Sequence, residues 1–357
     1  MLTRLEARTF RNLQDLDWSL GAGSHLLLGP NGAGKTSVLE AIYQLATTRS
    51  FRTRELKDCA RHGSDGFLVE GEVETGRRYH LTAGLTEGRK IRAVNGKATT
   101  LTEHLAVLPV VAWATGDAEI LTGTPALRRR FLDRGILGVR PAALLVLENF
   151  RRALLQKREI LQRGEGSITE ELASWNGVLS GAMVDLAEHR NGFVERLREE
   201  LARVLLELDL PLPAIEIRYR PSPSSTLSGA EEVFQSLMRI EEREIRRGAP
   251  LVGCQRDELE ILWGGREIRS VASAGERKVL ALALLSAHGR VLARAGRNPV
   301  YLLDDADAEL AAATLSSAWK IFAEAHQILA TSSRPQVWLA IDVESVWQVD
   351  KGVLRPL

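Results

Sequence analysis

The chain has few of the features that mark membrane, secreted or disulfide-bonded proteins. No apolar run approaches the ~20 residues that a membrane-spanning helix needs. The first residues, 1–6, lack the apolar block of a secretory signal peptide. The two cysteines, Cys59 and Cys254, form neither a disulfide framework nor a metal-binding spacing. These absences indicate a cytoplasmic protein with no membrane association.

The chain also has few aromatic residues and little excess charge. Aromatics make up 5% of the sequence, and the formal net charge is +1. A nucleic-acid contact would therefore have to come from local basic patches. No segment interleaves aromatic and basic side chains, as stacking platforms for single strands do. At 357 residues, two domains are a fair expectation.

One motif does stand out. Residues 29–36, GPNGAGKT, fit the phosphate-binding loop pattern G-x-x-x-x-G-K-[ST] at every fixed position. Residues 25–28 read as a buried strand, and residues 37–45 carry apolar side chains at helical spacing. In such a loop Lys35 reaches the terminal phosphates and Thr36 helps hold Mg²⁺. The predicted nucleotide contacts are Gly29, Pro30, Asn31, Gly32, Ala33, Gly34, Lys35, Thr36 and Ser37.

A second apolar segment, residues 299–303, ends in two carboxylates, as a Walker B strand does. Asp304 is the expected Mg²⁺ ligand, directly or through water. Asp305 is the expected catalytic carboxylate, which would orient or deprotonate the attacking water, with Lys35 as its catalytic partner at the phosphates. ATP and Mg²⁺ are thus the predicted cofactors. An acidic strand cap would look the same in isolation.

Upstream, Ser273 and Gly275 open a strongly apolar stretch, residues 279–285. A hydroxyl, an approachable glycine backbone and a helix N-terminus together make an anion site, although a plain serine N-cap gives the same pattern. A signature of this kind followed by Walker B resembles the order found in ABC-type ATPases. That resemblance implies that Ser273 and Gly275 contact the γ-phosphate bound at Lys35 of a partner chain, in an ATP-dependent homodimer.

Further segments resemble the RecF family of bacterial replication-gap repair ATPases, which is related to the heads of Rad50 and SMC proteins. They cover nearly the whole chain in order: FRNL at 10–13, SFR at 50–52, RRRFLD at 128–133, GCQRD at 253–257 and DDADAEL at 304–310. The resemblance implies ATP-dependent binding of duplex and junction or gapped DNA, action with RecR and RecO, and loading of RecA-type recombinase at gaps.

Four positions depart from the family pattern. Gln255 stands where the family has His, Glu276 where Gln is usual, and Ala311 where the family has Asp. The segment after Walker B leads to Ser332 and Ser333, not to the switch histidine of transporters. We therefore expect slow hydrolysis, with ATP acting as a switch.

The expected fold class is α/β, an ABC-type P-loop ATPase head with an inserted, mainly helical second domain. The two halves of the nucleotide site are far apart in sequence, which predicts a discontinuous ATPase domain of residues 1–120 and 250–357 and a helical arm at 121–249. Apolar residues at helical spacing predict two antiparallel helices in that arm, separated at residues 164–167.

Arginines near the expected ATP site and the arm are candidate DNA contacts, since guanidinium groups suit phosphate oxygens without reading sequence. The candidates are Arg52, Arg54 and Arg129. A solvated face or an internal ion pair is the alternative for each of them. For the whole chain, the sequence leaves two other functions open: a transporter ATPase subunit and a non-hydrolysing ATP-dependent assembly platform.

Overall fold

The computed structural model describes residues 1–113, 117–164, 168–208, 210, 212–268, 271–308 and 310–357. The chain divides into two compact units. The first comprises Met1–Ala118, Glu200–Pro211 and Ser273–Leu357, and the second comprises Glu119–Glu199 and Leu212–Ala272. In the described part of the chain no helix is both long and apolar enough to cross a lipid bilayer.

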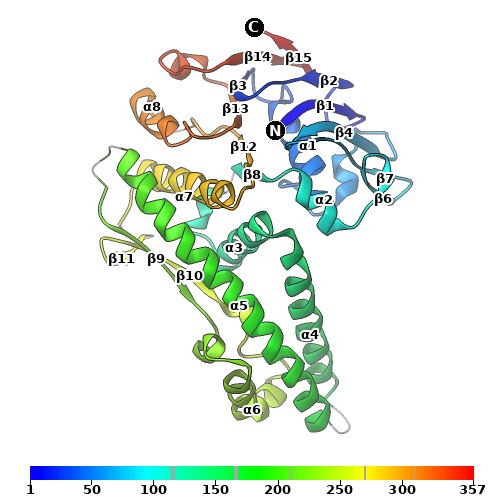
Figure 1. Ribbon diagram of the computed structural model, residues 1–357, viewed down its shortest axis with the longest axis vertical. Helices are drawn as coiled ribbons and strands as arrows, with labels where there is room; N and C mark the ends of the chain where they lie inside the picture. The colour runs from blue at the N-terminus through cyan, green and yellow to red at the C-terminus, as the bar shows by residue number, and fades with distance from the viewer. Residues whose placement is uncertain (114–116, 165–167, 209, 211, 269–270, 309) are drawn as a thin grey trace. The chain divides into compact units, whose positions relative to one another are not determined.

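The first unit contains two six-stranded sheets (Figure 1). The antiparallel sheet has the order β2-β1-β4-β5-β6-β7, with β1 Leu2–Arg8, β2 Leu16–Ser19, β4 Phe67–Glu74, β5 Arg78–Thr86, β6 Arg89–Val94 and β7 Lys97–Ala98. The mainly parallel sheet has the order β15-β14-β3-β13-β12-β8, with β3 Gly23–Leu28, β8 Val110–Trp113, β12 Val300–Leu303, β13 Gln327–Ser332, β14 Ser345–Asp350 and β15 Val353–Pro356.

Helix α1 (Lys35–Thr47) forms the centre of the first unit, between these sheets. It packs against β4 and β5 of one sheet and against β8, β12 and β13 of the other. Eleven of its thirteen residues are buried, as expected of a helix that is covered on all sides. The helices α2 (Leu101–Val107), α7 (Ala274–Arg294) and α8 (Ala312–Lys320) also lie in this unit, as does the end of α5 (Ile168–Glu207) from Glu200 onward. The phosphate-loop helix is therefore held on both faces by the core.

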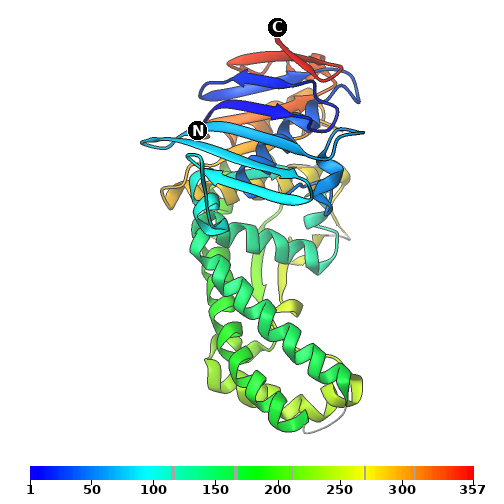
Figure 2. The same ribbon diagram turned by 90° about the vertical axis from the view of Figure 1, so that its right-hand side faces the viewer.

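The second unit is mainly helical (Figure 2). It contains α3 (Pro125–Val139), α4 (Leu144–Arg163), most of α5 (Ile168–Glu207) and α6 (Ala230–Arg247). Beside them lies a small antiparallel sheet, β11-β10-β9, formed by β9 Ile215–Arg220, β10 Glu258–Trp263 and β11 Arg266–Glu267. At the far end of α4, Ile160 and Leu161 pack with Leu172 of α5, which confirms the predicted pairing of two helices.

The unit boundaries differ from the expected limits at two points. The first boundary falls at residue 118, beside the expected 120. Residues 200–211, expected in the insertion, belong to the first unit, and residues 250–272, expected in the ATPase domain, belong to the second. The reason is strand pairing: β10 pairs along its whole length with β9, so this segment completes the sheet of the insertion. The first unit resumes at Ser273.

Candidate nucleotide site

The two predicted halves of the nucleotide site meet at one edge of the parallel sheet. Strand β13 lies between β3 and β12 and runs parallel to both. The phosphate loop leaves the carboxyl end of β3, and Asp304 follows the carboxyl end of β12. This edge is where open α/β sheets bind ligands. The predicted strand at 25–28 and helix at 37–45 are both confirmed.

The phosphate loop has the backbone that its glycines permit. Gly32 and Gly34 have φ values of +80° and +115°, a backbone region that residues other than glycine rarely adopt. A Cβ on Gly29 would lie 2.2 Å from the carbonyl oxygen of Val349. Lys35 Nζ donates to the carbonyl oxygens of Gly29 at 2.9 Å and Pro30 at 3.2 Å. The first turn of α1 contains no acidic residue, so the positive end of the helix dipole is not offset there.

Two neighbours of the loop were not predicted as site residues. Asn12 Nδ2 donates to the carbonyl oxygen of Gly32 at 2.9 Å, and Asn12 Oδ1 accepts from Ser37 Oγ at 2.7 Å. The backbone N–H of Gly352, in the turn between β14 and β15, donates to the carbonyl oxygen of Ala33 at 2.8 Å. For Asn12 a sequence signal existed, since it belongs to the FRNL segment. Nothing local marked Gly352.

Asp304 is buried and lies directly against the phosphate-loop helix. Its Oδ1 accepts hydrogen bonds from Thr36 Oγ1 and from Thr331 Oγ1, both at 2.8 Å. Burial raises the pKa of Asp304, and those two hydroxyl donors oppose the rise. A threonine hydroxyl beside a carboxylate is the hard-oxygen donor set that Mg²⁺ prefers. These residues therefore fit the predicted metal.

Asp305 is the second carboxylate that follows the carboxyl end of β12. It has a φ of +46°, and its backbone N–H donates to Thr331 Oγ1 at 2.9 Å. Among the described residues, its buried Oδ1 finds no hydrogen-bond partner. Burial and the neighbouring Asp304 carboxylate raise the pKa of Asp305, while the ammonium group of Lys35 lowers it. An unpaired carboxylate oxygen near Lys35 is consistent with a role toward water or a ligand.

Ser273 and Gly275 stand at the start of α7, as predicted. Ser273 is the N-cap: its hydroxyl accepts from the N–H of Glu276 at 3.3 Å, and its own N–H donates to Glu276 Oε2 at 2.8 Å. This capping box gives a local role to the glutamate that replaces the usual glutamine. Ser273 is exposed, and a Cβ on Gly275 would meet no atom within 4 Å. The described residues therefore leave the N-terminus of α7 uncovered.

The three candidate arginines have different surroundings. Arg52 is paired with the fully buried Glu40 at 3.3 Å, although 45% of its side chain stays exposed. Arg54 is exposed. Arg129, in the second unit, donates to the carbonyl oxygen of Asp257 at 2.9 Å, and burial lowers its pKa. Of the three, Arg54 has the surroundings most compatible with a surface contact.

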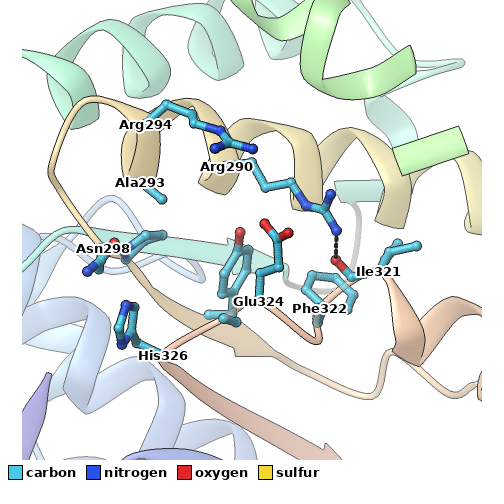
Figure 3. Close-up of a pocket in the computed structure, with 11 residues that line it drawn as sticks. Arg290, Ala293, Arg294, Asn298, Ile321, Phe322, Glu324 and His326 are labelled. Carbon is cyan, nitrogen blue, oxygen red and sulfur yellow. Dashed lines mark hydrogen bonds between the residues drawn. The ribbon is translucent and has the colours of Figure 1, made fainter. Parts of the chain in front are cut away.

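A separate cavity of about 140 Å³ lies near the other edge of the parallel sheet, beside the start of β12 and of β13 (Figure 3). Tyr301 and Phe322 line it together with Arg290, whose guanidinium donates to the carbonyl oxygen of Ile321 at 2.8 Å. Its lining contains none of the predicted nucleotide contacts.

The family comparison agrees with this geometry. Residues 1–353 match the family model "RecF/RecN/SMC N terminal domain". The chain is 33% identical over 323 residues to the DNA replication and repair protein RecF of Acidothermus cellulolyticus, covering 87% of each chain. It is 31% identical over 358 residues to the RecF protein of Moorella thermoacetica, covering 98% of this chain and 95% of that one.

Solved structures show the same fold. A structure described as the recombination mediator protein RecF-ATPrS in the RecFOR pathway superposes with a TM-score of 0.89 at 24% identity, covering 100% of this chain and 98% of that chain. An Smc head bound to the C-winged helix domain of ScpA gives a TM-score of 0.59 at 16% identity, covering 100% and 96%. The fold is thus the α/β fold of RecF and SMC-type ATPase heads, and the chain belongs to the RecF family of DNA replication and repair proteins.

Proposed function

We propose that this protein is an ATP-dependent DNA-binding repair protein that uses slow, Mg²⁺-dependent ATP hydrolysis as a switch. One observation carries the proposal: Thr36 and Asp304, 268 residues apart in sequence, are in hydrogen-bond contact beside Lys35. Lys35 and the loop glycines would bind the phosphates, and Thr36 and Asp304 would hold the metal. Asp305 would orient or deprotonate the attacking water. The first unit would be the ATPase domain and the second a helical insertion.

The nucleotide would also join two copies of the chain. Ser273 and Gly275 lie at the N-terminus of α7, where backbone N–H groups favour an anion, although Glu276 in the first turn offsets part of the helix dipole. In the proposed homodimer they contact the γ-phosphate bound at Lys35 of the second copy. ATP would then hold a two-fold symmetric pair together, and hydrolysis would release it.

The family relationship supports the proposed partners. A structurally similar RecF protein is described as a recombination mediator in the RecFOR pathway. By that relationship, we propose that this chain binds gapped DNA and duplex–single-strand junctions in the cytoplasm, acts with RecR and RecO, and promotes loading of a RecA-type recombinase. Arg52, Arg54 and Arg129 are its proposed DNA contacts. Membership in the RecF family argues against the transporter alternative.

A non-hydrolysing assembly platform is the second candidate. It is favoured by the Ala311 and Ser332 positions, where an aspartate and a switch histidine are absent. Phosphate release with and without DNA separates the two candidates. The switch role predicts DNA-stimulated release with a turnover below about 10 s⁻¹, the median for enzymes. Release at background level in both conditions would support the platform.

Sedimentation without nucleotide, with ADP and with ATP tests the dimer. We expect a dimer only with ATP, and a monomer for Ser273→Arg under all three conditions. Lys35→Met, which should not bind nucleotide, is the matched control. Wild-type protein that stays monomeric with ATP and DNA would contradict the proposed contact of Ser273 with a second copy.

A further inference from the structure

Asp305 has a left-handed backbone conformation, with a φ of +46°. A residue other than glycine keeps such a conformation where its surroundings enforce it. The turn that begins at Asp305 continues through Ala308, whose N–H donates to the carbonyl oxygen of Asp305 at 3.0 Å. Contacts from neighbouring segments also hold this turn.

Asp307 links this turn to the end of β13. Its side chain is buried, and its Oδ2 accepts a hydrogen bond from Ser332 Oγ at 2.7 Å. Ser332 Oγ in turn accepts from the N–H of Arg334 at 2.9 Å. The Arg334 guanidinium donates to the carbonyl oxygen of Asp307 at 2.8 Å. Both the side chain and the backbone of Asp307 are thus fixed by the same short segment.

Helix α7 also contacts the 305–308 turn. Lys278, on α7, donates from Nζ to the carbonyl oxygens of Ala308 at 2.5 Å and Asp305 at 3.5 Å. Neighbouring Thr331, also on β13, accepts from the N–H of Asp305. Thr331 and Ser332 are consecutive residues of β13, and they bond to Asp305 and Asp307 respectively. A shift of Asp307 would therefore also displace Asp305.

We propose that Asp307 is a positioning residue for ATP hydrolysis: through Ser332 and Arg334 it holds the 305–308 turn so that Asp305 keeps its left-handed backbone conformation beside the phosphate loop. This inference rests on the proposed function, since it concerns hydrolysis at that site. The hydrogen bond between Asp307 and Ser332 thus connects the 305–308 turn to the end of β13.

Steady-state kinetics test the role. Asp307→Ala should lower kcat by about 10- to 100-fold, the scale of a small misplacement of a catalytic group. The KM and the affinity for a fluorescent ATP analogue should stay within about twofold, because the phosphate loop is untouched. Asp307→Asn, whose amide oxygen still accepts from Ser332, should recover part of kcat. The exposed Asp342→Ala is the matched control.

Two further measurements keep the inference falsifiable. Ser332→Ala should lower kcat in the same direction, and the double variant with Asp307→Ala should lose less than the sum of the two effects. Amide hydrogen exchange at residues 305–308 should be faster in Asp307→Ala than in wild type, with or without nucleotide. An active wild type whose kcat is unchanged by Asp307→Ala overturns the inference, as does unchanged exchange. If wild type releases no phosphate, the proposed hydrolysis fails, and the exchange result alone still decides whether Asp307 holds the turn.

Discussion

Thr36 Oγ1 donates a hydrogen bond to Asp304 Oδ1 over 2.8 Å, which joins the phosphate-loop helix to the strand that carries the acidic pair. Removal of this hydroxyl in Thr36→Val should weaken nucleotide binding in the presence of Mg²⁺ by about 10- to 100-fold, the equivalent of one hydrogen bond to a charged group. Binding without Mg²⁺ should change little, because Lys35 and the loop backbone remain. Titration of a fluorescent ATP analogue with Mg²⁺ or EDTA measures both.

Thr36→Ser keeps the hydroxyl and serves as the control for this prediction. It should bind the Mg²⁺ nucleotide as wild type does. Equal weakening of Thr36→Val in Mg²⁺ and in EDTA would contradict a metal-holding role and point to a general loss of loop structure.

The second unit contains a fully buried ion pair. Lys157 Nζ on α4 lies 2.6 Å from Glu244 Oε2 on α6, and each side chain is 1% exposed. Lys157→Met should lower the free energy of unfolding by about 3–5 kcal/mol, because it leaves the carboxylate buried without its counter-charge. Adding Glu244→Gln should recover part of that loss. Urea denaturation measures both, with the exposed neighbour Arg158→Met expected within about 0.5 kcal/mol of wild type.

Two helical glycines of the second unit should respond in opposite directions to alanine. A Cβ on Gly135 of α3 would lie 2.1 Å from the ring of Phe193, so Gly135→Ala should destabilise by about 1–3 kcal/mol through overpacking. A Cβ on Gly177 of α5 would meet no atom within 4 Å, so Gly177→Ala should stabilise by up to about 1 kcal/mol through helix propensity. Thermal unfolding of both variants tests the pair. A stabilised Gly135→Ala would contradict the packing of Phe193 on Gly135, and a destabilised Gly177→Ala would contradict the open space beside Gly177.

His104 should make the first unit sensitive to mild acid. It is fully buried, its Nε2–H donates to the carbonyl oxygen of Leu45 at 2.6 Å, and burial lowers its pKa below the usual 6.5. The unfolded chain therefore binds a proton more readily, so stability rises with pH and is lost as pH falls below about 6.5.

His104→Gln keeps a donor for Leu45 but does not titrate. Urea midpoints between pH 5 and 7.5 should fall less steeply toward acid in this variant than in wild type. The exposed His62→Gln should leave the slope unchanged. A wild-type slope retained in His104→Gln would assign the acid sensitivity to other groups.

Local patterns allowed the nucleotide site to be predicted, because a phosphate loop and an acidic strand end are each written in consecutive residues. The contacts between them were not readable in this way. Thr331 reaches both Asp304 and Asp305 only because β13 pairs between β3 and β12 in one particular register. The capping role of Glu276 was not predicted either, because the sequence showed it only as a departure from the family pattern.

The family-like segments at 128–133 and 253–257 show a similar limit. The sequence presents them as separate motifs, and Arg129 as a DNA candidate. In the structure, Arg190 of α5 joins them, with hydrogen bonds to Asp133 at 2.8 Å and to Asp257 at 2.7 Å. Arg190 carried no sequence signal, since a buried arginine on a helix looks like any surface arginine until its partners are known. These segments therefore have a structural role inside the second unit.

Of the three candidate DNA contacts, Arg54 is the most informative to test, because the three arginines have different surroundings. It is exposed, whereas Arg52 pairs with Glu40, and Arg129 bonds to the backbone of the 253–257 segment. Arg54→Glu should weaken binding to gapped duplex DNA in the presence of ATP and reduce the slope of log affinity against log salt by about 1, the value for one lost phosphate contact. Fluorescence anisotropy at several salt concentrations measures both quantities. Arg355→Glu, an exposed reversal at the end of the chain, should change neither by as much. Equal effects of the two reversals would indicate net charge alone and remove Arg54 from the DNA contacts.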